Sequence, residues 1–168
     1  SDLNIDLTYI LINNFIYGLT NSQTSPTTPK GMWTATMERG NIDPTFDSCK
    51  LVEAAGASFV ARETMIDPKK LERTLVKALE HKGFSYLEVF SNCHVNLGRK
   101  NKMASATANL DWIDSISVAK TKFDMLEKKK KDGKYPTGVL KQDENALEYC
   151  EAYEKVKEAH KNKTMVEL

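Results

Sequence analysis

Three short apolar runs alternate with two helix patterns, and this alternation restricts the fold of the chain more than any other feature. The runs cover residues 7–12, 58–62 and 84–90. The first is apolar on both faces, which is typical of an interior strand in a parallel sheet. Strands that alternate with helices in this way predict an α/β fold with a parallel sheet and right-handed crossovers.

The two helix patterns lie between these runs. The first covers residues 46–55 and ends before Gly56, a residue that commonly terminates helices. The second is better marked, because Asp67 can cap its amino terminus and Pro68 suits its first turn. We expect it to end near residue 81, and its apolar stripe consists of Leu71, Leu75, Ala78 and Leu79.

The character of the sequence changes after the third run. Residues 96–102 read as a polar turn, residues 105–131 carry a helix pattern, and residues 133–136 interrupt it. A final helix is expected over residues 144–161. We therefore predict a helical tail over residues 105–168 that packs on the sheet or on a partner subunit.

The composition excludes several classes of function. The 168 residues include 24 basic and 23 acidic side chains, so no excess positive charge favours nucleic acid as a partner. No apolar run is long enough to span a membrane and no signal segment opens the chain, so we expect a cytoplasmic protein. The cysteines Cys49, Cys93 and Cys150 are too few for a complete zinc or iron–sulfur site of their own.

The pair Asn13–Asn14 follows the first apolar run and opens an aperiodic segment, residues 15–44, that is rich in Thr, Ser, Pro, Gly and Asn. Ligand sites in α/β proteins lie at the carboxyl ends of strands, and loops of this length are usually functional. An amide oxygen and a loop carbonyl suit a magnesium ion that also binds phosphate. A turn-forming Asn pair before a soluble loop is the alternative interpretation. Hydroxyls that could assist come from Thr20, Ser22, Thr24, Ser25, Thr27 and Thr28.

Four collinear segments of the chain resemble the β subunit of the 2-oxoacid:ferredoxin oxidoreductases, and the 2-oxoglutarate branch looks most similar. The first is NNFIYGLTNSQTSPTTPKG, residues 13–31. The others are GNIDPTFDSCKLVEAAGASFVARET, ALEHKGFSYLEV and SNCHVNLGRKN, which begin at Gly40, Ala78 and Ser91. The resemblance covers roughly residues 5–104. It implies that residues 1–104 are the C-terminal part of a thiamine-diphosphate-binding parallel-sheet domain.

The resemblance assigns the Asn pair to the diphosphate-binding half of a thiamine diphosphate site. It implies that the Asn14 side chain and the Ile16 carbonyl bind Mg²⁺. The Gly-Asp-Gly turn that precedes the Asn pair in this family is absent from the 168 residues, so we expect the chain to be a C-terminal fragment. The residues that the resemblance places at the cofactor or substrate are Asn13, Asn14, Ile16, Tyr17, Gly18, Leu19 and Thr20.

One departure concerns the loop that follows Thr20. The family usually has Thr-Gly-Gly-Gln where this chain has Asn21 and Ser22 between Thr20 and Gln23. Losing two glycines removes easy access to positive φ, although Asn tolerates it better than most residues. We therefore assign no residue here to the substrate carboxylate, and we assign no catalytic residue. We expect residues 19–37 to be partly disordered when no cofactor is bound.

Cys93 is the thiol with a functional assignment by resemblance. The family's Ser-x-Cys segment supplies one thiolate of a [4Fe–4S] cluster, and this chain has His94 where the family often has Pro. Without that resemblance, a lone Cys at a strand end would be interpreted as a small buried apolar residue. We interpret Cys49 and Cys150 as packing residues on helices. Arg62 and Arg99 each follow a strand and could face an anion or form structural ion pairs.

The resemblance implies a subunit of an enzyme that oxidatively decarboxylates 2-oxoglutarate to succinyl-CoA. It implies thiamine diphosphate, Mg²⁺ and a [4Fe–4S] cluster as cofactors, and ferredoxin or a flavodoxin-like protein as electron acceptor. The expected partners are an α subunit, further small subunits and coenzyme A. Pyruvate or another 2-oxoacid is the alternative substrate, and the fragment alone is expected to be an inactive subunit-contact domain.

Overall fold

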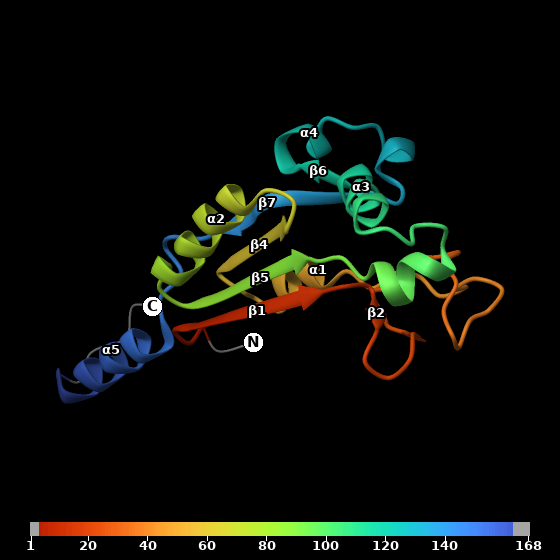
Figure 1. The fold of residues 1–168 in the computed structure, drawn as a ribbon. Coiled ribbons are helices and arrows are strands. Elements are labelled where there is room, and N and C mark those ends of the chain that lie inside the picture. The colour runs from red at the N-terminus through yellow and green to blue at the C-terminus, as the bar shows by residue number, and fades with distance from the viewer. Residues whose placement is uncertain (1–3, 163–168) are drawn as a thin grey trace.

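The computed structural model describes residues 4–162, which form a mixed α/β domain around one main sheet (Figure 1). Strands β1 (Leu7–Asn13), β4 (Phe59–Thr64) and β5 (Phe84–Phe90) correspond to the three apolar runs of the sequence. Helices α1 (Ser48–Ala54) and α2 (Pro68–Glu80) lie between them in the chain. The predicted α/β fold class is confirmed.

The main sheet has five strands in the order β1-β5-β4-β7-β6. Strands β1, β5 and β4 are parallel, with Asn13 opposite Phe90 and Arg62 opposite Glu88. Strand β7 (Tyr135–Gln142) runs antiparallel to β4 with a register shift between Val60 and Ala61. The short strand β6 (Ser117–Ala119) is parallel to β7. The three parallel strands therefore end at the same edge of the sheet, where β1 continues into the long loop.

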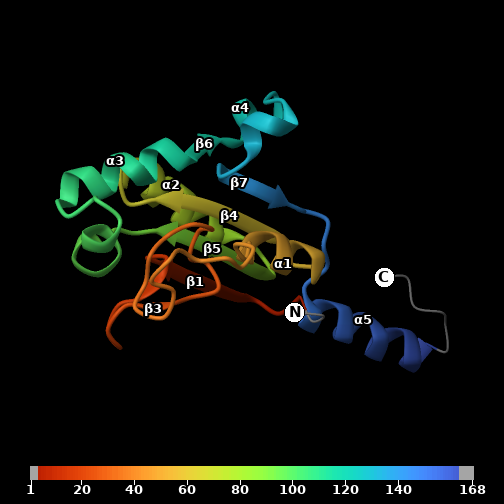
Figure 2. The same cartoon turned by 90° about the vertical axis from the view of Figure 1, so that its right-hand side faces the viewer.

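Helices α1 and α2 cover opposite faces of the sheet (Figures 1 and 2). Phe59, Ala61 and Leu87 pack with Ala78 on the α2 side, whereas Val60 and Tyr86 pack with Cys49 on the α1 side. Helix α2 starts as predicted, with Pro68 in its first turn and Asp67 Oδ1 accepting a 3.0 Å hydrogen bond from Lys70 N. Alternation of side chains along the strands divides the apolar residues between two layers.

Strand β1 occupies an edge of the sheet, which differs from the interior position that its sequence predicts. Its apolar side chains are substantially exposed, with 47% for Leu7 and 62% for Ile12. Among the described residues, α1 and α2 pack on β4 and β5, and no strand pairs with the outer edge of β1. The apolar pattern of a strand indicates which side chains could be buried. The tertiary structure determines which neighbours, if any, cover them.

The predicted helix over residues 105–131 is correct only at its start. Helix α3 (Ala106–Ile116) ends before β6, and the short helix α4 (Lys120–Asp124) and a 3₁₀ turn (Lys128–Lys131) follow. The prediction also missed β7, because residues 133–136, which contain Gly133 and Pro136, read as a break between helices. This part of the chain adds two strands to the sheet, and the predicted division at residue 104 stays a prediction.

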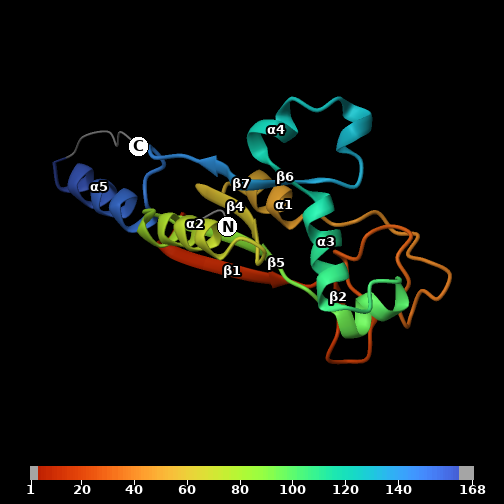
Figure 3. The same ribbon diagram turned by 45° about the horizontal axis from the view of Figure 1, so that its top comes forward.

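A third apolar cluster lies at the carboxyl ends of the parallel strands and includes residues of α3. Figure 3 shows α3 beside this end of the sheet. Phe15 packs with its ring centroid 4.7 Å from that of Phe90 and 5.1 Å from that of Trp112. The other buried members are Ile16, Leu97, Ile113 and Ile116. This cluster anchors the start of the long loop on the sheet.

Helix α5 (Tyr149–Asn162) extends away from the sheet at the opposite end of the strands (Figures 1 to 3). It begins later than the predicted residue 144. Cys150 is exposed on this helix, so its predicted packing role was wrong, whereas Cys49 is buried on α1 as expected. Within residues 4–162, no helix has the length and apolar character needed to cross a membrane.

Candidate functional site at the carboxyl ends of the parallel strands

The turn that follows β1 is built by the side chain of Asn13. This side chain is 7% exposed, and its Oδ1 accepts hydrogen bonds from Phe15 N at 2.9 Å and Thr27 Oγ1 at 2.8 Å. Its Nδ2 donates to Glu88 Oε1 at 2.8 Å. Phe15 adopts a left-handed conformation with φ 64°, which reverses the chain. Asn13 thus fixes the turn through bonds within the protein.

Asn14 is half-buried at this turn, and its Oδ1 accepts a long hydrogen bond of 3.3 Å from Ile16 N. Tyr17 and Gly18 follow in a hairpin formed by β2 (Ile16–Tyr17) and β3 (Gln23–Thr24). Tyr17 is 53% exposed, and Leu19 and Thr20 are exposed. The predicted residues therefore form one continuous segment, with Asn13 and Ile16 buried, Asn14 and Gly18 half-buried, and the tip of the hairpin in solvent.

The structure brings the Asn pair next to the segment that contains Cys93. A Cβ atom added to Gly18 would lie 3.8 Å from Asn14 Nδ2, 3.6 Å from Cys93 Sγ and 3.2 Å from Asn96 Nδ2. Asn96 Nδ2 donates a 2.9 Å hydrogen bond to Gly18 O. A Cβ at position 18 would require Asn96 to shift by a few tenths of an ångström, whereas its distances to Asn14 and Cys93 are ordinary van der Waals contacts. The two predicted cofactor segments thus meet at Gly18.

Cys93 is half-buried between β5 and a π-helical turn (His94–Gly98). Its backbone N donates a 2.9 Å hydrogen bond to Asn109 Oδ1 on α3. Asn109 is fully buried, and its Nδ2 is among the buried side-chain atoms that have no hydrogen-bond partner in the described structure. In residues 4–162, no cluster of three or more His, Cys, Asp or Glu side chains is arranged to hold a metal ion. An iron–sulfur cluster bound at Cys93 would therefore require ligands from outside the described residues.

Hydroxyl groups hold the long loop together. Thr28 Oγ1 donates to Phe15 O at 2.6 Å, and Asn41 Nδ2 donates to Thr28 O at 2.8 Å. Ser25 Oγ lies 2.8 Å from Thr27 Oγ1. These hydroxyls, predicted as possible phosphate donors, are engaged within the loop. Its mobility without cofactor stays a prediction.

Asn21 and Ser22, which replace two family glycines, both adopt positive φ, at 77° and 72°. Ser22 is 2% exposed, its N donates to Tyr17 O at 3.0 Å, and its O accepts from Ala35 N at 2.7 Å. The backbone path that glycine would favour is therefore kept, at a cost in conformational strain.

A cluster of three charged residues includes Glu88 and Arg62, which are buried, and Asp47, which is partly exposed. Glu88 was missed by sequence reasoning, although a carboxylate within the apolar run FSYLEVF is a signal that could have identified it. Arg62 is 1% exposed, and its Nε donates to Glu88 Oε2 at 2.6 Å while its Nη2 pairs with Asp47. Arg62 thus forms structural ion pairs, one of the two alternatives left open by the sequence, whereas Arg99 is exposed.

These charges alter the pKa values of their neighbours. Burial acts to raise the pKa of Asp47, but the Arg62 guanidinium and the Lys50 backbone N–H outweigh it, so this pKa lies below its ordinary value. Burial raises the pKa of the Cys49 thiol far above its usual range, which keeps it protonated. Cys49 is therefore a packing residue, as expected.

Two of the larger cavities border this region. One of about 520 Å³ is lined by Tyr17, Thr24, Met37 and Phe46, among others. Another of about 740 Å³ is lined by loop residues together with Trp112, Tyr135 and several lysines. Tyr17, an exposed residue, borders the first of them, and its assignment to a ligand site stays a prediction.

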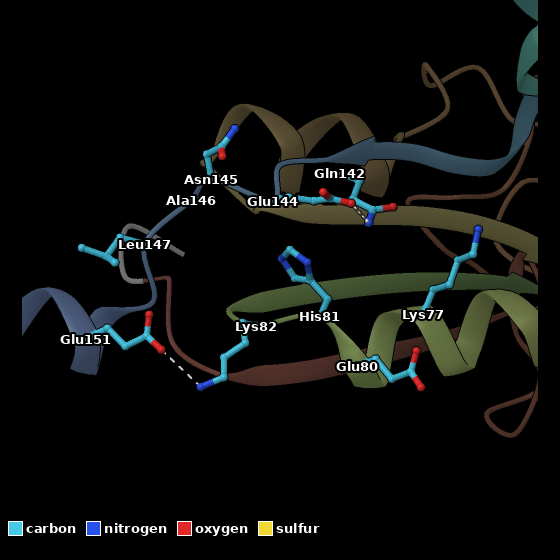
Figure 4. Close-up of a pocket in the computed structure, with 10 residues that line it drawn as sticks. All are labelled: Lys77, Glu80, His81, Lys82, Gln142, Glu144, Asn145, Ala146, Leu147 and Glu151. Carbon is cyan, nitrogen blue, oxygen red and sulfur yellow. Dashed lines mark hydrogen bonds and ion pairs between the residues drawn. The ribbon is translucent and has the colours of Figure 1, made fainter.

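A further cavity of about 730 Å³ lies at the amino ends of the strands (Figure 4). Two of its charged side chains, Lys82 and Glu151, form a 3.2 Å ion pair. His81 borders it, with Nε2 2.8 Å from Ser58 Oγ. None of the residues that the sequence assigns to a ligand line this cavity, so the candidate site is the opposite edge of the sheet.

Fold and turn together define a class of protein, a thiamine-diphosphate-binding α/β domain. The description of the family that matches residues 1–89 is "Thiamine pyrophosphate enzyme, C-terminal TPP binding domain". The chain belongs to this family, which confirms the expected domain type.

Similarity to individual relatives is more specific than the family match. The chain is 41% identical to 2-oxoglutarate synthase subunit KorB of Methanothermobacter marburgensis over 135 residues, 80% of this chain and 47% of the relative. It is 39% identical to KorB of Archaeoglobus fulgidus over 158 residues, 92% of this chain and 54% of the relative. The chain thus spans about half the length of these relatives.

A solved structure shares the fold. It is 2-oxoglutarate:ferredoxin oxidoreductase from Magnetococcus marinus with 2-oxoglutarate, coenzyme A and succinyl-CoA bound. The match has a TM-score of 0.72 at 24% identity and covers 98% of this chain and 56% of that chain. The expected resemblance to 2-oxoglutarate oxidoreductase β subunits is confirmed by the KorB relatives.

Proposed function

We propose that this chain supplies the diphosphate-binding half of the active site in a 2-oxoglutarate:ferredoxin oxidoreductase. The observation that carries the proposal is the placement of the Asn13–Asn14 turn at a strand end and beside Cys93, with Gly18 between them. The similarity to KorB subunits over 80% of the chain supports the choice of substrate.

In this proposal the Asn14 side chain and the Ile16 carbonyl bind Mg²⁺. Both are hard oxygen donors, and they lie two residues apart on one tight turn. Among the described residues, Asn14 Oδ1 accepts only a long hydrogen bond, so the donor set fits the ion. Asn13 holds the turn, and Tyr17, Gly18, Leu19 and Thr20 line the cofactor. When bound, thiamine diphosphate supplies the carbanion that adds to the 2-oxo carbon and the electron sink for loss of CO₂.

Cys93 is proposed as one ligand of a [4Fe–4S] cluster that passes electrons to ferredoxin or a flavodoxin-like acceptor. Its half-exposed thiol and its position beside Gly18 fit a cluster close to the thiamine site. The remaining ligands come from chain outside residues 4–162. The acyl group is transferred to coenzyme A, and the product is succinyl-CoA.

The proposed assembly contains an α subunit and further small subunits and is cytoplasmic. The 168-residue chain by itself carries half of a metal site and one cluster ligand. We therefore propose that it is inactive alone and that residues 105–168 include subunit contacts.

The test is turnover by the intact assembly that contains this chain. It should reduce a low-potential dye with 2-oxoglutarate and coenzyme A, and removal of thiamine diphosphate should abolish the reaction. Pyruvate serves as the competing substrate, because the changes at Asn21 and Ser22 lie beside the predicted pocket. Faster turnover of pyruvate would place the enzyme in the other branch, and turnover that needs no thiamine diphosphate would refute the proposal.

The cluster assignment has its own test. In the same assembly, Cys93→Ser should lower the iron content by the equivalent of one cluster, because serine is a poor ligand for this centre. Cys150→Ser is the matched control, since Cys150 is exposed on α5 at the far end of the sheet. Equal iron content in the two variants would contradict the role of Cys93.

A further inference from the structure

The buried carboxylate of Glu88 connects the predicted metal turn to a charge on the neighbouring strand. Glu88 lies on β5, between Leu11 of β1 and Arg62 of β4 in the strand register. Its Oε1 accepts from Asn13 Nδ2 at 2.8 Å, and its Oε2 accepts from Arg62 Nε at 2.6 Å. At 2% exposure, both oxygens are occupied by protein donors.

Arg62 is held rigidly on the other side. Its Nη2 pairs with Asp47, and its guanidinium carbon lies 5.4 Å and 5.3 Å from the ring centroids of Phe90 and Tyr135. A guanidinium packed between two rings and two carboxylates has one available geometry. It therefore fixes the position of Glu88 Oε2, and with it the orientation of the whole carboxylate.

The orientation of Glu88 in turn determines which end of the Asn13 amide faces the turn. Because a carboxylate only accepts hydrogen bonds, Asn13 must direct Nδ2 towards Glu88 and Oδ1 towards Phe15 N and Thr27 Oγ1. The reversed amide would set Asn13 Nδ2 against the Phe15 N–H, two donors facing each other. The turn that presents Asn14 and Ile16 therefore depends on the position of Glu88 and on the two acceptor oxygens of its side chain.

We propose that Glu88 is a positioning residue for magnesium and thiamine diphosphate, acting through Asn13 on the ligands Asn14 and Ile16. The inference rests on the proposed function and adds a residue that touches neither the ion nor the cofactor. A buried ion pair contributes little net stability, and well-packed apolar residues often serve as well. Its role here is to fix one orientation of a polar turn.

The same sheet contains a matched control. Glu63, next to Arg62 on β4, is also buried and paired, with Oε2 3.0 Å from Lys70 Nζ and Oε1 accepting from Thr74 Oγ1 at 2.8 Å. It makes these contacts with α2 and none with the Asn13 turn. Glu63→Gln should therefore lower stability without changing the metal site.

The experiment measures the affinity of the intact assembly for MgCl₂ at saturating thiamine diphosphate by calorimetry. In Glu88→Gln, the amide oxygen can accept a hydrogen bond from either Arg62 or Asn13. The amide nitrogen, which is a donor, then faces the donor of the remaining residue. We expect Mg²⁺ affinity to fall by about 10-fold or more, the usual effect of losing a residue that orients a metal ligand. Glu63→Gln should bind Mg²⁺ like wild type.

A compensating double variant distinguishes the loss of the Asn13 side-chain orientation from a general loss of stability. Asn13→Asp alone sets two carboxylates against each other and should also weaken Mg²⁺ binding. In the double variant with Asn13→Asp and Glu88→Gln, the carboxylate at position 13 accepts hydrogen bonds from the introduced amide and from Phe15 N. The affinity for Mg²⁺ should therefore recover. Wild-type affinity in Glu88→Gln, equal losses in Glu88→Gln and Glu63→Gln, or no recovery in the double variant would each overturn the proposal. Failure of the wild-type assembly to bind Mg²⁺ with thiamine diphosphate would instead refute the proposed function.

Discussion

Asn96 donates a 2.9 Å hydrogen bond from its side chain to the carbonyl of Gly18, a residue 78 positions earlier in the chain. This bond joins the hairpin that follows the Asn13–Asn14 turn to the segment that follows Cys93. Further along the long loop, Asn101 makes two more bonds of this kind, accepting from Trp33 N at 2.8 Å and donating to Trp33 O at 3.0 Å.

Removing this bond should loosen the hairpin. In Asn96→Ala we expect faster amide hydrogen exchange over residues 17–20 and a loss of about 1 kcal/mol in the free energy of unfolding. Asn92→Ala is the control, because the hydrogen bond that its side chain makes among the described residues is to nearby His94, at 3.4 Å, and not to the hairpin. Unchanged exchange in the hairpin of Asn96→Ala would show that other contacts hold it.

Ser22 should be a site of stored backbone strain. Ser22→Gly should raise the free energy of unfolding by about 1 kcal/mol, because glycine adopts the observed φ of 72° without a Cβ clash. Ser22→Ala removes the same hydroxyl but keeps the Cβ, so it should give no increase. Denaturant unfolding measures both, and equal stability in the two variants would argue against strain at this position.

His81 should make the stability of the chain depend on pH. Burial lowers its pKa below the ordinary 6.5, although Asp6, Asp143 and Glu144 act to raise it. The unfolded chain therefore binds more protons between the folded-state pKa and 6.5, and stability is lost as the pH falls through that window. Urea unfolding across this range should show the loss in wild type and a flatter profile in His81→Gln. The exposed His160 on α5 provides the control His160→Gln, which should retain the wild-type profile.

Asp47 should contribute to acid stability through Arg62. Its pKa lies below the ordinary 3.8, so its contribution is present above pH 3.8 and is lost as the pH falls through the folded-state pKa. Asp47→Asn should cost on the order of 1–3 kcal/mol at neutral pH and remove this part of the acid dependence.

The control for Asp47 is Asp67→Asn on α2. Both aspartates cap a helix by accepting a hydrogen bond from a backbone N–H three residues later. Only Asp47 also pairs with a buried arginine. Thermal unfolding at two pH values should therefore separate the variants, and identical profiles would contradict the assignment to the ion pair.

Patterns within single segments accounted for much of the fold. The apolar runs predicted β1, β4 and β5, and Asp67 and Pro68 predicted the start of α2. The Asn13–Asn14 pair at the end of the first run located the candidate site. Each of these features depends on neighbouring residues in the chain, whose propensities and capping bonds are local.

Contacts between distant segments were decided only by the tertiary structure. It placed β1 at an edge, inserted β7 beside β4, and paired Glu88 with Arg62 and Asn13. These relationships follow from strand order and register, which bring together residues whose separation in sequence carries no signal. The sequence alone therefore determined which residues are predicted to bind the cofactor. The fold decided that Gly18, Cys93 and the Asn13–Asn14 turn meet at one place, because the parallel strands β1 and β5 end side by side.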